Sequence, residues 1–64
     1  MMQPIKNERF EIIAWVHIDP DGRKDLRDAQ YRIIGYYDPS VDRTYDGSLR
    51  WIGDGDLLMT LVPR

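Results

Sequence analysis

The sequence predicts an all-β protein: a small antiparallel sheet or small barrel made of two hairpins, in a single domain spanning residues 1–64. Two observations predict this fold. Apolar and polar residues alternate with the period of a β-strand over residues 9–18 and 29–37. Turn-forming sequences then divide the apolar runs into hairpins. The chain of 64 residues has room for only one small core and has no cysteine to reinforce it with disulfides.

The first hairpin begins with the alternating residues 9–18, which are rich in β-branched and aromatic side chains. The turn sequence Asp19-Pro20-Asp21-Gly22 follows, in which proline presets one backbone angle and glycine accepts a positive φ. Residues 29–37 then form the returning strand. The competing interpretation makes residues 24–30 a short helix, which would make the fold α+β, but seven residues are few for a stable helix.

The register of this hairpin depends on the length of its loop. A three-residue loop would place Asp28 opposite Ala14, a polar group on the apolar face. A four-residue loop, Pro20–Arg23, instead places Phe10 opposite Ile33 and matches apolar with apolar residues. We therefore predict the four-residue loop, because a slip of one residue would exchange the two faces of the strand.

The second hairpin is predicted from Asp54-Gly55, which lies between the apolar residues 48–53 and 56–62. Asp-Gly is typical of the type I′ turn, whose two central residues both need a positive φ. This hairpin would place Trp51 opposite Leu58.

The irregular residues 38–47 join the two hairpins. They include a candidate helical turn at Asp38-Pro39 and a turn at Asp46-Gly47. No internal repeat is evident in the chain. Both faces of the predicted strands are partly apolar, so we expect either a curled sheet or association with a second copy, a homo-oligomer.

Charge and hydropathy exclude several classes of protein. The net charge of −2 contains no basic excess, which disfavours nucleic acid as a partner. The longest apolar stretch, residues 12–16, is too short to cross a membrane. Residues 1–8 lack the apolar block of a secretory signal, so a cytoplasmic location is expected.

No constellation of residues indicates catalysis. His17 is the only histidine, and neither Ser40 nor Ser48 lies in a nucleophile motif. We expect His17 to be a half-buried strand residue opposite Leu26. The aspartates around Gly22 lack the spacing of a calcium loop. The sequence therefore predicts a protein without catalytic residues, cofactor or metal ligands.

These observations favour a small, non-enzymatic module that binds another protein. Its contact surface would combine tyrosines with the acidic C-terminal half; the adjacent Tyr36 and Tyr37 point to opposite faces if they lie on a strand. A sharper form of the hypothesis is an acidic inhibitor or regulator that occupies the nucleic-acid-binding site of its partner. The candidate partner-binding residues are Tyr36, Tyr37, Asp38, Asp42, Asp46, Asp54 and Asp56.

The alternative is a small-barrel protein that binds single-stranded nucleic acid. Such a protein stacks bases on exposed aromatic rings that lie beside basic side chains. Arg32, Arg43 and Arg50 are the arginines that we consider for this role.

Overall fold

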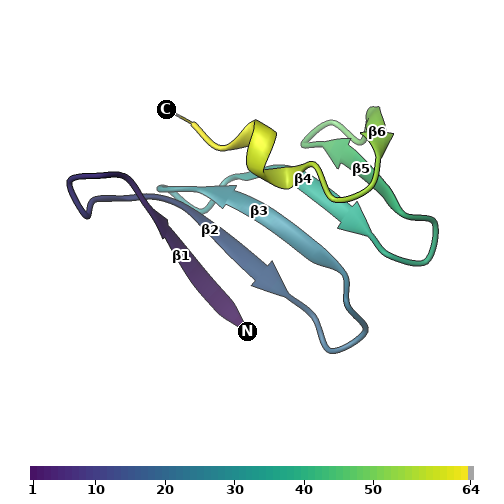
Figure 1. The fold of residues 1–64 in the computed structure, drawn as a ribbon, viewed down its shortest axis with the longest axis horizontal. Helices are drawn as coiled ribbons and strands as arrows, with labels where there is room; N and C mark the ends of the chain where they lie inside the picture. Colours follow the sequence, from purple (N-terminus) through teal and green to yellow (C-terminus); the bar gives the residue numbers. More distant parts are fainter. Residues whose placement is uncertain (64) are drawn as a thin grey trace.

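The computed structural model describes residues 1–63 and confirms the all-β prediction. Its six strands form one antiparallel sheet in the order of the chain, with β1 and β6 at the two edges (Figure 1). The elements are β1 (Met2–Lys6), β2 (Ile12–Ile18), β3 (Lys24–Asp28), β4 (Ile33–Asp38), β5 (Arg43–Asp46), β6 (Trp51–Asp54) and the 3₁₀ turn η1 (Leu58–Leu61). Within residues 1–63, no helix has the length and apolar character needed to span a membrane.

Three of the five hairpin loops have the same structure, and all three lie at the same end of the sheet. We call them the Asx loops: residues 7–11, 28–32 and 46–50. In each, the side-chain oxygen of the first residue, Asn or Asp, accepts hydrogen bonds from the backbone N–H groups two and four residues later. The fourth residue of each loop has a positive φ, and these residues are Phe10, Tyr31 and Leu49.

The Asx loops belong to an eight-residue repeat that corrects our reading of a chain without repeats. The repeats are residues 7–14, 28–35 and 46–53. The seventh residue is always isoleucine and is the extra residue of a β-bulge, at Ile13, Ile34 and Ile52. The eighth residue is always small, at Ala14, Gly35 and Gly53. A bulge bends its strand and increases the twist, so the three hairpins that contain the repeat bend at the same place.

The predicted register of the first hairpin is wrong. The structure has the three-residue loop, with Asp19 paired to Arg23 and Ala14 opposite Asp28. The reason is Gly22, whose φ of 92° completes a three-residue turn with a left-handed last residue. Asp28 is tolerated opposite Ala14 because its carboxylate accepts hydrogen bonds from the backbone of its own Asx loop.

The same region corrects two further expectations. Residues 24–30 contain strand β3 and not a helix, and residues 29–32 belong to an Asx loop and not to one continuous strand. Phe10 therefore lies in a loop, with no strand partner at Ile33. Asp38-Pro39 begins a turn without helix, in which Asp38 accepts hydrogen bonds from the Ser40 N–H and hydroxyl groups.

The second predicted hairpin is also wrong. Strand β6 pairs with β5, and residues 56–62 form no strand. Gly55 has the expected positive φ of 82°, but its N–H donates to the carbonyl of Asp42. The buried Thr44 hydroxyl then donates to the Gly55 carbonyl at 2.6 Å and accepts from the Leu57 N–H at 2.9 Å. These bonds turn the chain back across the sheet.

Residues 57–62, the C-terminal segment, cross one face of the sheet over the small residues of the repeats. A Cβ atom on Gly35 would lie 2.6 Å from Leu61 and 3.0 Å from Leu58, and one on Gly53 would lie 2.5 Å from Leu57. The core cluster consists of Ala14, Leu26, Leu58 and Val62. Figure 1 shows η1 in yellow against β4, the strand that it contacts most. The small residues therefore let the leucines reach the backbone of the sheet.

Replacing Leu58 with alanine tests this packing. Leu58 is buried, so its loss leaves a cavity and should lower the free energy of unfolding by about 2–5 kcal/mol. Urea unfolding followed by circular dichroism measures the change. Met59→Ala is the matched control, since Met59 is 55% exposed and should change stability by less than about 1 kcal/mol. Equal effects of the two variants would contradict the packing.

Acid should weaken the Asx loops that begin with aspartate. Backbone hydrogen bonds, foremost that from the Arg32 N–H, lower the pKa of Asp28, and the Arg50 N–H does the same for Asp46. A carboxylate whose pKa is lower in the folded than in the unfolded protein stabilises the fold. This stabilisation is complete at a pH above the unfolded-state pKa, near 3.8, and is lost as the pH falls through the folded-state pKa. We therefore expect the melting temperature to drop below about pH 4.

The variant Asp46→Asn isolates this effect, because Asn7 shows that an amide oxygen can make the same two backbone hydrogen bonds. The melting temperature of this variant should fall less between pH 5 and pH 2, an acid range set by ordinary carboxyl pKa values of roughly 4. An identical fall in both proteins would show that Asp46 does not contribute.

Candidate interaction surfaces

The two faces of the sheet differ in what lies on them. The covered face carries Gly35, Thr44 and Gly53 under the C-terminal segment. Of the elements in residues 1–63, η1 packs on the covered face, and only side chains of the Asx loops reach over the other face, which we call the open face. Paired residues of neighbouring strands point to the same face of a sheet, so the register assigns one continuous row to the open face. The row is Met2, His17, Asp25, Tyr36, Tyr45 and Trp51.

Aromatic rings therefore gather on the open face. Tyr36, Tyr45 and Trp51 are neighbours on β4, β5 and β6. On β2, Trp15 stacks with Tyr31 of the second Asx loop, with ring centroids 5.5 Å apart. Leu49 of the third Asx loop lines a shallow hollow of about 400 Å³ together with Tyr36 and Tyr45. Two of the three left-handed loop residues thus extend this aromatic surface.

Charged groups are interspersed among these rings. Asp25 lies 3.2 Å from the Arg27 Nε and 3.7 Å from the Nδ1 of His17. Arg43 lies over the ring of Trp51, 5.8 Å from its centroid. Of the three arginines considered for base stacking, Arg43 has such a contact, whereas Arg32 and Arg50 pair with the aspartates of their own Asx loops. The open face is therefore aromatic with mixed charge.

His17 is a half-buried strand residue as predicted, but it lies opposite Asp25 and not Leu26. Its Nδ1 atom is also 3.5 Å from Asp19. Among the described residues, no group of three histidine or acidic side chains is placed to hold a metal ion.

The structure brings together most of the predicted partner-binding residues, although on different faces. Tyr36 lies in the row of the open face. Tyr37 pairs with the buried Thr44, so its side chain points to the covered side, and its hydroxyl donates to Asp42 at 2.8 Å. Asp38, Asp42, Asp54 and Asp56 lie around the β4–β5 turn and the end of β6. Asp46 lies at the opposite end of the sheet, in an Asx loop.

Six of the aspartates lie at this turn end of the sheet. Four positively charged groups lie there, the side chains of Arg23, Lys24 and Arg43 and the amino group of Met1 bonded to Ile18. They offset only part of the negative charge, and Lys24 pairs with Asp56 at 2.9 Å. At the Asx-loop end, Asp28 and Asp46 each pair with an arginine. The six aspartates of the acidic end are Asp19, Asp21, Asp38, Asp42, Asp54 and Asp56.

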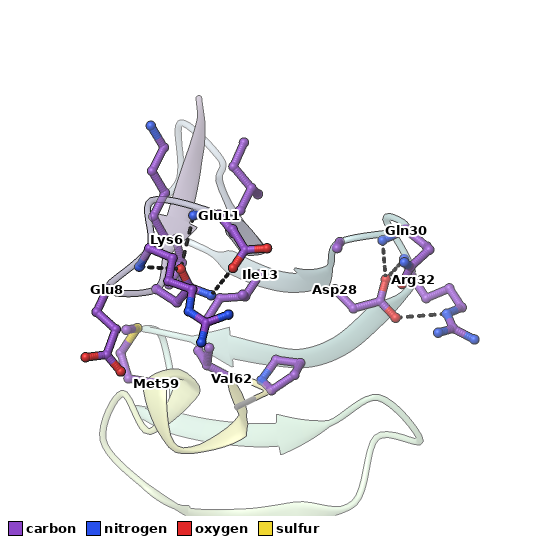
Figure 2. A pocket seen from close by; sticks show the side chains of 15 residues that line it. Lys6, Glu8, Glu11, Ile13, Asp28, Gln30, Arg32, Met59 and Val62 are labelled. Carbon is purple, nitrogen blue, oxygen red and sulfur yellow. Dashed lines mark hydrogen bonds and ion pairs between the residues drawn. The ribbon is translucent and has the colours of Figure 1, made fainter.

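An open groove of about 940 Å³ lies on the covered side, beside the C-terminal segment. Figure 2 shows it between the first Asx loop, with Glu8 and Glu11, and the second, with Asp28 and Arg32. Val62 and Met59 border it from the C-terminal segment. The dashed bonds of Asp28 in Figure 2 run to Gln30 and Arg32, so this carboxylate is engaged within its own loop. The groove therefore offers apolar walls with a charged rim of both signs.

The common face of Trp15, Tyr31, Tyr45 and Trp51 was not predicted from the sequence. Their common face depends on the bulges, which displace the alternation by one residue in three of the five hairpins. The eight-residue repeat was the available signal, since it marks every bulge with isoleucine before a small residue. A comparison of the chain with known protein families, curated proteins and solved structures finds no match.

The contact of Tyr37 with Asp42 predicts a late titration of this tyrosine. The hydrogen bond to Asp42 is the largest cause that raises the pKa of Tyr37 above its ordinary value of 10.0. Asp42→Asn should lower that pKa towards the ordinary value, because it removes the negative charge beside the phenol. Ultraviolet titration of the tyrosines, with Tyr37→Phe to identify the signal, measures the shift. An unchanged titration would show that the contact is not formed.

Proposed function

We propose that this protein is a non-enzymatic interaction module that binds another protein through its open face. The observation that carries the proposal is the gathering of five aromatic side chains, four from the strands and Tyr31 from an Asx loop, on the sheet face opposite the C-terminal segment. Tryptophan, tyrosine and arginine are the residues that most often dominate the binding energy of protein interfaces. Arg27 and Arg43 lie among these rings.

The backbone of the Asx loops supports the same proposal. Phe10, Tyr31 and Leu49 are 82%, 51% and 67% exposed, and each has a positive φ at which glycine would avoid strain. Strained residues persist where the surrounding structure or a function requires their side chains. For Tyr31 and Leu49, the side chain extends the aromatic surface and so supplies such a function.

The acidic end indicates the charge of the partner. The excess of aspartates over positively charged groups beside the open face favours encounter with a basic protein surface. A nucleic-acid-binding site is a surface of this kind. The acidic inhibitor is therefore the specific form of the proposed function that this end of the sheet favours, and nucleic acid would then compete with the module for its partner.

The second candidate function is the binding of single-stranded nucleic acid. Arg43 over Trp51, beside Tyr45 on the same face, is the observation that favours it. Asp25 and the acidic end oppose it, because they would lie close to the phosphates of a strand stacked on these rings.

Tyr31→Gly tests the open face without straining the fold, since glycine adopts the positive φ freely. The tagged protein captures its partner from the native host, and the affinity for the purified partner is measured by calorimetry. Tyr31→Gly should weaken binding by about tenfold or more, the effect typical of an interface anchor. Phe10→Gly is the matched control, because Phe10 has the same loop position and φ but no aromatic partner in the described structure; it should leave the affinity unchanged.

Two results would contradict the proposal. One is a captured partner whose affinity is the same for both glycine variants and for the parent protein. The other is salt-dependent binding of a single-stranded oligonucleotide that Tyr31→Gly abolishes, which would establish the second candidate instead.

A further inference from the structure

The two edges of the sheet differ in their capacity to pair with another strand. The backbone groups of Met1 and Ile18 hydrogen-bond to each other. In an antiparallel ladder the next residue along the strand points its N–H and C=O groups the other way, so the backbone polar groups of Met2 and Pro4 point to the outer edge of β1. Pro4 has no N–H and leaves this edge without a donor at its centre. Proline on an edge strand is a common protection against pairing with other chains.

Strand β6 contains no proline, so its outward backbone groups are complete. Gly55 donates to Asp42, and Thr44 is opposite Gly53, so the same alternation directs the N–H and C=O groups of Asp54 to the outer edge. Trp51, opposite Tyr45, is the next residue whose backbone N–H and C=O groups point to the outer edge, and the bulge at Ile52 lies between Trp51 and Asp54. The outer edge of β6 therefore presents two pairing residues, and nothing within residues 1–63 pairs with it.

The apolar side chains of β6 are also more exposed than the residues at the same positions of the other two repeats. Ile13 and Ile34 pack against the core, whereas the equivalent Ile52 is 39% exposed. Trp51 is 60% exposed on the open face. An exposed apolar strand with free backbone groups is a site at which another strand adds to a sheet.

We propose that two copies of this chain pair through their β6 strands, antiparallel and about a two-fold axis. Trp51 of each copy then lies opposite Asp54 of the other. Each copy has the same bulge between Trp51 and Asp54, so the distance between these two residues is the same on both strands. Both Trp51–Asp54 pairs can therefore form backbone hydrogen bonds together. The result is one continuous sheet that joins the open faces of both copies.

Charge complementarity favours a second copy as the occupant of this edge. Arg50 lies just before β6 and Asp56 just after it. Antiparallel pairing places Arg50 opposite Gly55 of the second copy, between Asp54 and Asp56 of that copy. Within each copy Arg50 also contacts Asp46 and Asp56 contacts Lys24, so the exposed Asp54 is the carboxylate that Arg50 of the other copy complements. The acidic end of each copy then lies beside the Asx-loop end of the other, which has no excess of negative charge. A pairing with parallel strands would instead bring the two acidic ends together.

Sedimentation equilibrium of the full chain tests the proposal. The strand has only four residues, so we expect a weak dimer with a dissociation constant on the order of 0.1 mM, and a mass that rises from 7.6 kDa towards twice that value with concentration. Asp54→Pro removes the outward N–H of β6 and should leave a monomer. Met2→Pro removes the equivalent outward N–H of β1 and is the matched control, which should still dimerise. Asp54→Arg should weaken the dimer about fivefold through repulsion by Arg50.

A protein that remains monomeric to about 2 mM, well above that expected constant, would overturn the proposal. Dimerisation that Met2→Pro abolishes and Asp54→Pro preserves would also overturn it, because the contact would then be β1. Should Asp54→Pro fail to fold, amide exchange of the parent protein decides the question. The Trp51 and Asp54 amides should exchange more slowly at high concentration while the Met2 amide does not, and the absence of that difference would contradict pairing through β6.

Discussion

The close approach of the C-terminal segment to the sheet is the contact on which the rest of this structure depends. Leu57, Leu58 and Leu61 reach the strands only because Gly53 and Gly35 have no side chains where they pass. A single small sheet cannot bury both of its faces, and a chain of 64 residues has few apolar residues with which to cover even one. By covering one face, this segment leaves the open face as the surface that we propose binds a partner.

The eight-residue repeat places an Asx loop, a bulge and a small residue on the covered face at three positions of this short chain. An asparagine or aspartate closes each Asx loop through its side-chain oxygen. The bulged isoleucine then shifts the strand by one residue and brings the small eighth residue to the covered face. The same shift directs Trp15 and Tyr36, each the ninth residue counted from the start of its loop, to the open face. The small residues on the covered face and the aromatic row on the open face thus have a common origin in the bulges.

The sequence predicted the fold class and the turns at Asp19–Gly22 and Asp46–Gly47, because these depend on local backbone preferences. It also predicted that Tyr36 and Tyr37 point to opposite faces. The register failed because the apolar matching assumed unbroken alternation over residues 9–18 and 29–37, which the Asx loops and the bulges at Ile13 and Ile34 interrupt. Asp28 appeared unfavourable opposite Ala14 because its hydrogen bonds to its own loop could not be foreseen.

The second hairpin failed for a different reason. Asp54-Gly55 is a strong local hairpin signal, but the Thr44 hydroxyl and the glycines of β4 and β6 stabilise a crossing of the sheet instead. This choice depends on tertiary contacts between residues far apart in the chain. The grouping of the acidic residues was only partly foreseen for the same reason: Asp46 is near Asp42 in sequence but lies at the other end of a strand.

The most direct test of the packing that defines both faces is a nuclear Overhauser spectrum of the protein in solution. The account predicts cross-peaks from the Leu58 and Leu61 methyl groups to the Gly35 α-protons, and from the Leu57 methyl groups to those of Gly53. Cross-strand peaks between Gly53 and Asp56, with none from Leu58 to Gly35, would instead show a hairpin at Asp54-Gly55. That result would contradict the covered face and every inference drawn from it.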